Sequence, residues 1–119
     1  QADNAYIHDI HYENIRVEDV AQKLFDIKVL ECKYSWTYQK GRIEDIYFKD
    51  IKVLNGNFPV SIIRGYEMRL EESRPERIHF DNIEILGKRC RSVLDMHMVV
   101  ELAHKIYVDG VMEYPRNKF

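Results

Sequence analysis

A short motif recurs four times along the chain, and this repeat restricts the possible folds more than any other feature. Each copy starts at an isoleucine, alternates polar and apolar residues, and reaches another aliphatic residue five positions later. Alternating β-branched and aromatic residues indicate strands. A strand motif at this period is typical of a repeat protein in which each unit packs against its neighbours. The copies start at Ile10, Ile46, Ile78 and Ile106, at spacings of 36, 32 and 28 residues, and their cores span residues 7–17, 43–53, 75–85 and 103–113.

The alternation breaks at the same point in every copy. In the first copy Ile10 and Tyr12 share one face, but the next apolar residues are Ile15 and Val17. A continuous strand cannot place these side chains on one face, because its side chains alternate strictly. One residue must therefore be absorbed in a bend. Asparagine, aspartate and glycine tolerate a left-handed backbone, so each copy is predicted to be two short strands meeting at a corner. The corner residues are Asn14, Asp50, Asn82 and Gly110.

A third apolar segment follows each corner and completes a predicted coil. The segments are residues 24–27, 58–63 and 93–96. Coils stacked in parallel would align their apolar residues in columns, and would also stack the corner residues, whose side chains can bond to neighbouring backbone. We therefore expect one all-β segment over residues 1–119, a parallel β-helix (β-solenoid) of about four coils. The predicted columns are Ile10/Ile46/Ile78/Ile106, Tyr12/Phe48/Phe80/Val108 and Ile15/Ile51/Ile83/Val111.

Other all-β architectures compete with this prediction. A meander or a sandwich needs hairpin turns at short spacing, and Asn55-Gly56 is the strong hairpin dipeptide that we identify. A short open mixed sheet without a solenoid is a further alternative.

Composition and charge exclude several functional classes. Lysine and arginine total 18 against 20 acidic residues, a formal net charge of −2, so we expect no nucleic acid partner. No apolar run approaches the roughly 20 residues of a membrane span, and no membrane partner is expected. Cys32 and Cys90 belong to no metal-spaced pair, so we expect no metal and no cofactor. Cys90 lies among basic residues that would lower a thiol pKa, although an unreactive thiol is the simpler interpretation.

Two columns of outward residues are candidate functional surfaces. The first is an aromatic ladder, which could stack on sugar rings or could simply stabilise the sheet. The second carries charge: Asp9 and Asp45 on adjacent coils resemble a pair of glycosidase carboxylates, but Arg77 lies next to Asp45 and would make an ordinary ion pair. The ladder is His11, Tyr47, His79 and Tyr107, and the charged column is Asp9, Asp45, Arg77 and Lys105.

The two longest connections, residues 28–42 and 64–77, are candidate binding loops. Loops on one side of a solenoid commonly build its binding face. Trp36, the single tryptophan, lies near tyrosines and suits stacking on carbohydrate, or alternatively fixes its loop to the coil. The candidate substrate-binding residues are Trp36, Tyr38, Tyr47, His79, Arg64, Tyr66 and Glu67.

The repeat and its corner resemble the right-handed parallel β-helix of pectin-degrading enzymes. The segments that carry the resemblance are residues 10–15, 59–66 and 78–88, and the likeness is greatest to the C-terminal coils of bacterial glycoside hydrolase family 28-like proteins, the polygalacturonase relatives. That family's catalytic signature includes Asn-x-Asp, Asp-Asp and Gly-His-Gly, and none of these occurs in this chain. The resemblance therefore implies no catalytic residue here.

These observations lead to two functional hypotheses. In the first, the chain is a truncated, C-terminal β-helix portion of a polysaccharide-active, glycoside hydrolase-like protein, which is inactive alone and packs against upstream coils. The chain begins at Gln1 without an initiator methionine, so we expect processing or trimming of a longer protein. The resemblance also implies a pectin-type polymer as partner and a secreted or periplasmic location. In the second, the chain is a non-catalytic β-solenoid that binds glycan or self-assembles as a homo-oligomer through its open ends.

Overall fold

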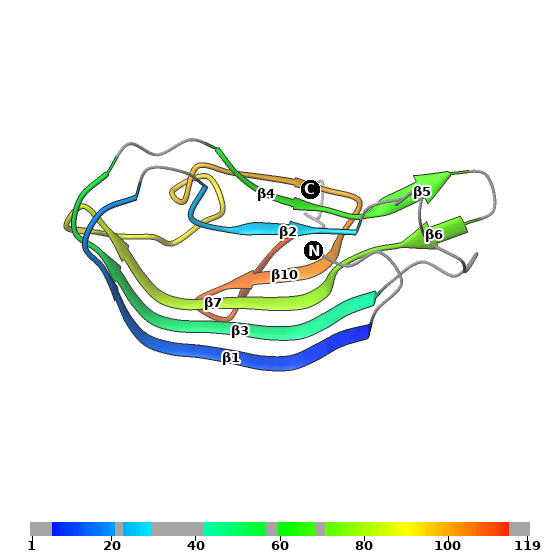
Figure 1. The fold of residues 1–119 in the computed structure, drawn as a ribbon, viewed down its shortest axis with the longest axis horizontal. Coiled ribbons are helices and arrows are strands. Elements are labelled where there is room, and N and C mark those ends of the chain that lie inside the picture. The colour runs from blue at the N-terminus through cyan, green and yellow to red at the C-terminus, as the bar shows by residue number, and fades with distance from the viewer. Residues whose placement is uncertain (1–5, 21–22, 30–41, 57–59, 69–70, 115–119) are drawn as a thin grey trace.

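The computed structural model describes residues 6–20, 23–29, 42–56, 60–68 and 71–114 (Figure 1). Within these ranges the chain forms strands and turns and no helix, so the expected all-β class is confirmed. It follows that the described residues contain no helix able to cross a membrane.

The large sheet takes one long strand from each copy of the repeat. Strands β1 (Tyr6–Val17), β3 (Arg42–Val53), β7 (Glu76–Ile85) and β10 (His104–Val108) lie side by side in parallel (Figure 1). Ile46 pairs with Ile10 on one side and with Ile78 on the other, and Ile78 pairs with Ile106. The first two predicted columns are confirmed over all four copies, because the repeat spacings place equivalent residues opposite one another.

The predicted corner is a left-handed backbone position in each of the first three strands. Asn14, Asp50 and Asn82 have φ values of 55°, 56° and 53°. Pairing stops at the residue before each corner and resumes at the residue after it, so the corner residues fall opposite one another without pairing. Apolar residues on both sides of the corner can therefore share the same face.

The strands also bend at a second left-handed position, which the sequence analysis did not anticipate. The residues of the charged column have φ values between 53° and 57°: Asp9, Asp45, Arg77 and Lys105. Aspartate tolerates this backbone, but arginine and lysine do not favour it, so residue type indicated the bend in the first two copies and not in the last two.

A small second sheet lies across from the large one. Strands β2 (Asp26–Lys28), β4 (Ser61–Arg64) and β9 (Met98–Glu101) pair in parallel and in that order. β2 and β4 fall in the expected third segments, but the prediction of residues 93–96 is wrong for the third copy. Those residues form turns, in which Val93 O accepts from Met96 N, and the strand begins at Met98.

The fourth copy does not continue as a coil. Asp109 and Gly110, both with positive φ, form a two-residue hairpin turn that reverses the chain into β11 (Val111–Tyr114), antiparallel to β10. Val111 therefore pairs with Val108 and is exposed, so its predicted place in the Ile15 column is wrong. Leu86 and Gly87 form the same kind of turn between β7 and β8 (Lys88–Arg89).

The structure also defines two connections that the residue pattern left open. Asn55-Gly56 makes no hairpin, because Gly56 instead forms a parallel bridge with Val20 of the preceding coil. The connection 64–77 is not an irregular loop, because it contains the antiparallel hairpin of β5 (Tyr66–Met68) and β6 (Glu71–Ser73), which projects beyond the two larger sheets in Figure 1. Residues 30–41, most of the other predicted loop, lie outside the described residues.

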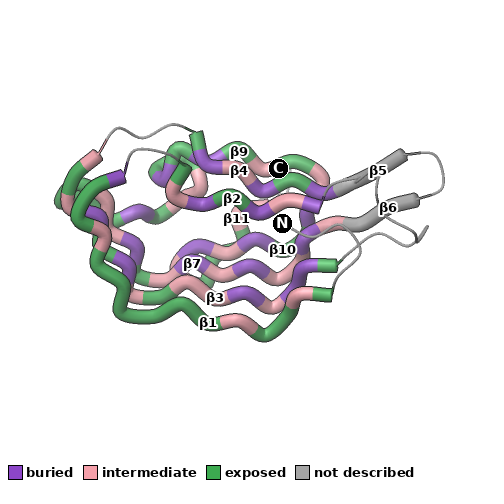
Figure 2. The backbone as a smooth tube through the Cα atoms, viewed as in Figure 1, coloured by how far each residue is buried: buried purple, intermediate pink, exposed green. Residues whose placement is uncertain are grey.

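The core lies between the large and small sheets, and strands of both sheets contribute buried residues to it (Figure 2). Phe25, just before β2, packs its ring edge-on against Phe48 and Phe80 at centroid distances of 4.8 and 4.9 Å. These contacts join the two sheets. The sheets are not closed by backbone pairing, and the large one is mixed, because β8 and β11 run antiparallel to their neighbours.

Candidate functional site

The aromatic ladder exists as a continuous stack on the outer face of the large sheet. Consecutive rings, from His11 through Tyr47 and His79 to Tyr107, lie 4.4, 4.7 and 4.7 Å apart between centroids. Their planes differ by 5° to 9°. In-register parallel strands impose this arrangement, since equivalent side chains on adjacent strands sit about 4.8 Å apart.

The stacking limits how the ladder can bind a ligand. Both faces of Tyr47 and of His79 are covered by neighbouring rings, so neither ring can offer a face to a sugar. What the stack can offer to solvent is a row of ring edges carrying hydroxyl groups and imidazole nitrogens. Burial lowers the pKa of His79, which keeps its imidazole neutral at pH 7.

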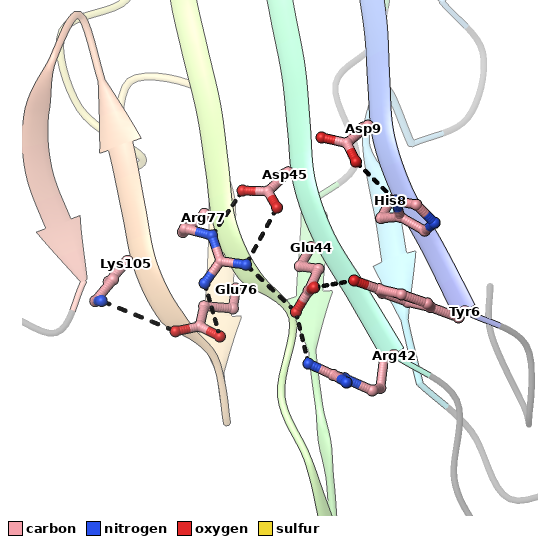
Figure 3. A network of polar contacts seen from close by, with 9 residues as sticks. All are labelled: Tyr6, His8, Asp9, Arg42, Glu44, Asp45, Glu76, Arg77 and Lys105. Carbon is pink, nitrogen blue, oxygen red and sulfur yellow. Dashed lines mark hydrogen bonds and ion pairs between the residues drawn. The ribbon is translucent and has the colours of Figure 1, made fainter.

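A network of charged side chains flanks the ladder at the second bend (Figure 3). Arg77 donates to both carboxylate oxygens of Asp45, at 2.6 Å from Nε and 3.1 Å from Nη2. The same guanidinium reaches Glu76 at 3.1 Å and Glu44 at 3.4 Å. The ion pair between Asp45 and Arg77 is therefore confirmed, and Asp9 instead bonds to the neighbouring His8 at 2.7 Å.

Glu44 is the most buried acidic group of this network. Its carboxylate accepts hydrogen bonds from the Tyr6 hydroxyl and, at 3.0 Å, from Arg42. The hydrogen bond from Tyr6 and the nearby guanidinium groups lower the pKa of Glu44, and the hydrogen bonds from Arg77 lower that of Asp45. The bond to Glu44 raises the pKa of Tyr6.

This charge balance does not suit general acid catalysis. A glycosidase acid needs a carboxyl whose pKa is raised so that it carries a proton near neutral pH. Glu44 and Asp45 have the opposite pKa shift, because the Tyr6 hydroxyl and two arginines stabilise the charged form of Glu44, and Arg77 stabilises that of Asp45. The network is suited to fixing the register of β1, β3 and β7.

The structure describes the side chains of three of the predicted binding residues, and these three lie on two different sheets. Tyr47 and His79 are adjacent in the ladder, whereas Arg64 lies on β4 of the small sheet and pairs with Glu101 at 3.0 Å. Trp36 and Tyr38 lie outside the described residues. For Tyr66 and Glu67 the described part is the backbone of β5. His11 and Tyr107 complete the ladder, and the repeat register was the signal that found them.

The described residues show no cluster of three or more His, Cys, Asp or Glu side chains that could hold a metal ion. The Cys90 thiol is buried, and this burial raises its pKa to about 11. The reactive-thiol interpretation of Cys90 is therefore wrong, and the simpler one holds.

Comparisons with protein-family models, with curated proteins and with solved structures find no match to this chain. The catalytic signature of the polygalacturonase relatives has a fourth part, Arg-x-Lys, and the interpretation that all four parts are absent is wrong for this one, because Arg116-Asn117-Lys118 has its spacing. It lies outside the described residues, and a match of this length assigns no role by itself.

Proposed function

We propose that this chain is the C-terminal portion of a right-handed parallel β-helix in a polysaccharide-active protein of the pectin-degrading type. The observation that carries the proposal is the in-register parallel stacking of repeat copies, with left-handed corner residues falling opposite one another. The resemblance of residues 10–15, 59–66 and 78–88 to polygalacturonase relatives supplies the substrate class and a secreted or periplasmic location. The chain itself contributes binding surface and no catalytic residue.

The glycan contact in this proposal is the row of ring edges along the ladder. Hydroxyl groups on Tyr47 and Tyr107 can donate to and accept from sugar hydroxyls and carboxylates. Lys105 neighbours Tyr107 along β10, and its amino group lies 4.0 Å from Glu76. Glu76 balances this cation, so the acidic polymer in the proposal comes from the resemblance and not from the local charge.

The test is titration of the chain with oligogalacturonides, followed by NMR, alongside an assay for new reducing ends. We expect amide shifts along the ladder and no hydrolysis. Tyr47→Phe with Tyr107→Phe keeps the stack and removes the hydroxyls, so it should weaken binding. Tyr12→Phe is the matched control, because Tyr12 stacks on Phe48 outside the ladder. Absence of binding, or turnover by this chain alone, contradicts the proposal.

The second candidate is a non-catalytic solenoid that binds glycan or self-assembles. It is favoured by the open edge of β1, which leaves apolar side chains exposed. Stable dimers or higher oligomers at micromolar concentration, with no effect of oligogalacturonides, would identify this alternative.

A further inference from the structure

The core of the large sheet is exposed at one end and sealed at the other. In one inward column the exposed fraction falls from 42% at Tyr12 to 0% at Phe80, and it is still only 1% at Val108 of the last copy. In another it falls from 36% at Ile15 to 0% at Ile83. The first coil is therefore covered on one side alone.

The uncovered side is a continuous edge of backbone and apolar side chains. β1 is the edge strand of the large sheet and β2 that of the small sheet, and neither has a partner on its outer side among the described residues. A cavity of about 490 Å³ opens there, lined by residues of both strands and of the next coil. Its lining from the first coil includes Ile7, Ile10, Tyr12, Ile15, Leu24 and Phe25. A long apolar edge of this kind is a template for another strand.

The opposite side of the large sheet ends in two antiparallel hairpins. β11 folds back along β10, and β8 folds back along the end of β7. Arg89 of β8 pairs with Asp109 at 2.9 Å, which ties the two hairpins together. One side of the sheet therefore ends in two short antiparallel strands, whereas the described residues on the other side leave the full length of β1 as the edge.

The bends of β1 select which strand can fill the open edge. Its left-handed residues, Asp9 and Asn14, lie five positions apart, and β3 matches them with Asp45 and Asp50 in parallel register. An antiparallel strand could match the apolar residues of β1 or its bends, but not both. The two bends are not symmetric about the inward residues Ile10 and Tyr12. If the inward residues faced one another, each bend of the added strand would therefore lie opposite an unbent residue of β1.

We infer that the edge of β1 and β2 is a docking surface for one further coil of the same repeat, supplied by the same polypeptide. The inference rests on the solenoid part of the proposed function and not on the glycan. The docking coil runs parallel to β1 and carries residues that accept a left-handed backbone five positions apart. A second copy of the chain does not supply such a strand, because β11 covers its β10 edge and its own β1 would pair antiparallel.

The test is a variant with an extra coil: a copy of residues 42–68 fused ahead of Gln1. The copied Arg42 then lies 32 residues before Tyr6, which is the spacing between paired residues of β3 and β7. We expect the urea midpoint to rise, and the outward amides of β1 to exchange at least about tenfold more slowly with solvent deuterium. The matched control carries Asp45→Val and Asp50→Val in the copied coil alone, which forbids both bends, and it should leave β1 exchange unchanged.

A second measurement uses the unmodified chain. A peptide of residues 42–53, added in excess, should shift the NMR signals of β1 amides, and the same peptide with both valine substitutions should not. If neither the matched coil nor the peptide affects β1 while β3 and β7 exchange slowly, the docking surface is refuted and the solenoid stands. If the amides of β3 and β7 exchange as rapidly as those of β1, the docking surface and the solenoid are both refuted. A dimer of the unmodified chain with β1 fully protected identifies a second copy as the occupant and overturns the inference.

Discussion

Asn82 donates a hydrogen bond from Nδ2 to Oδ1 of Asp50 across 2.7 Å, and both residues hold a left-handed backbone. The backbone amide of Asn82 also donates to Oδ1 of Asp109 at 2.9 Å. The corner is thus stabilised by contacts between coils as well as by residue type. Changes at this position should reveal how much of the stability depends on the bend.

Asn82→Val should destabilise the chain strongly. A β-branched residue at positive φ together with the lost hydrogen bond costs about 2–3 kcal/mol, whereas Asn82→Gly loses the bond without the backbone strain and costs about 1 kcal/mol. Urea unfolding of both variants measures the difference. Equal losses for the two variants would show that the bend is not under steric control.

Arg77→Gln should flatten the acid limb of the stability curve. The folded-state pKa values of Glu44 and Asp45 lie below their ordinary values, so both carboxylates stabilise the fold above about pH 4.5, and this contribution is lost as the pH falls through the folded values. Without Arg77 the shifts shrink, and stability should change less between pH 5 and pH 2.5. Arg64→Gln is the control, since its ion pair with Glu101 is exposed and contributes about 0–1 kcal/mol.

His79→Phe should reduce the loss of stability on mild acidification. Burial places the folded pKa of His79 below its ordinary value of 6.5, so the folded state resists protonation and stability falls as the pH drops below about 6.5. Phenylalanine keeps the ring stack and cannot take up the proton. Unfolding midpoints at pH 7.5 and pH 5 give the comparison, with Tyr107→Phe as a control that keeps the imidazole.

Gly56→Ala should cost more stability than Gly87→Ala. A Cβ at Gly56 would lie 2.5 Å from the backbone oxygen of Val20, so the first and second coils would have to separate locally. A Cβ at Gly87 meets open space, and the cost there is the left-handed backbone alone, about 1–2 kcal/mol. Thermal unfolding of the two variants tests the ranking, and the reverse order would contradict the bridge between Val20 and Gly56.

Leu86→Asn should stabilise the chain. Leu86 is exposed and holds a φ of 51° in the turn before Gly87, where asparagine is the preferred residue. We expect a gain of about 0.5–1 kcal/mol in the free energy of unfolding, since little apolar burial is lost. A Leu86→Ala variant, which lacks the local preference of asparagine, should show no such gain.

The sequence predicted the parts of the fold that follow from alternation and from residue type. The break between Tyr12 and Ile15 located the corner, and the repeat spacing located the stacked partners of Tyr47 and His79. The second bend was missed although Ile7 and Ile10 also break the alternation. Its residue types misled the analysis in the later copies, because Arg77 is stabilised there by contacts with Asp45 and two glutamates that exist only after the strands pair.

The end of the repeat was also missed, for a different reason. Residues 106–113 resemble the earlier copies closely enough to predict another corner, but Asp109-Gly110 is equally a hairpin signal. Only the pairing of Val111 with Val108 distinguishes the two outcomes. The ladder of the candidate site was predicted from the repeat. Its mode of binding was not, because the rings stack on one another and their faces are not open to a sugar.

The two hairpins on the far side of the large sheet have a consequence for misassembly. Fibril growth by strand addition needs an edge at both ends of each molecule, and here the hairpins at Leu86-Gly87 and Asp109-Gly110 leave only the short strands β8 and β11 at one of them. The long edge is the one at β1, whose two bends disfavour an antiparallel β1 of a second molecule, so strand addition is disfavoured at both edges of this sheet.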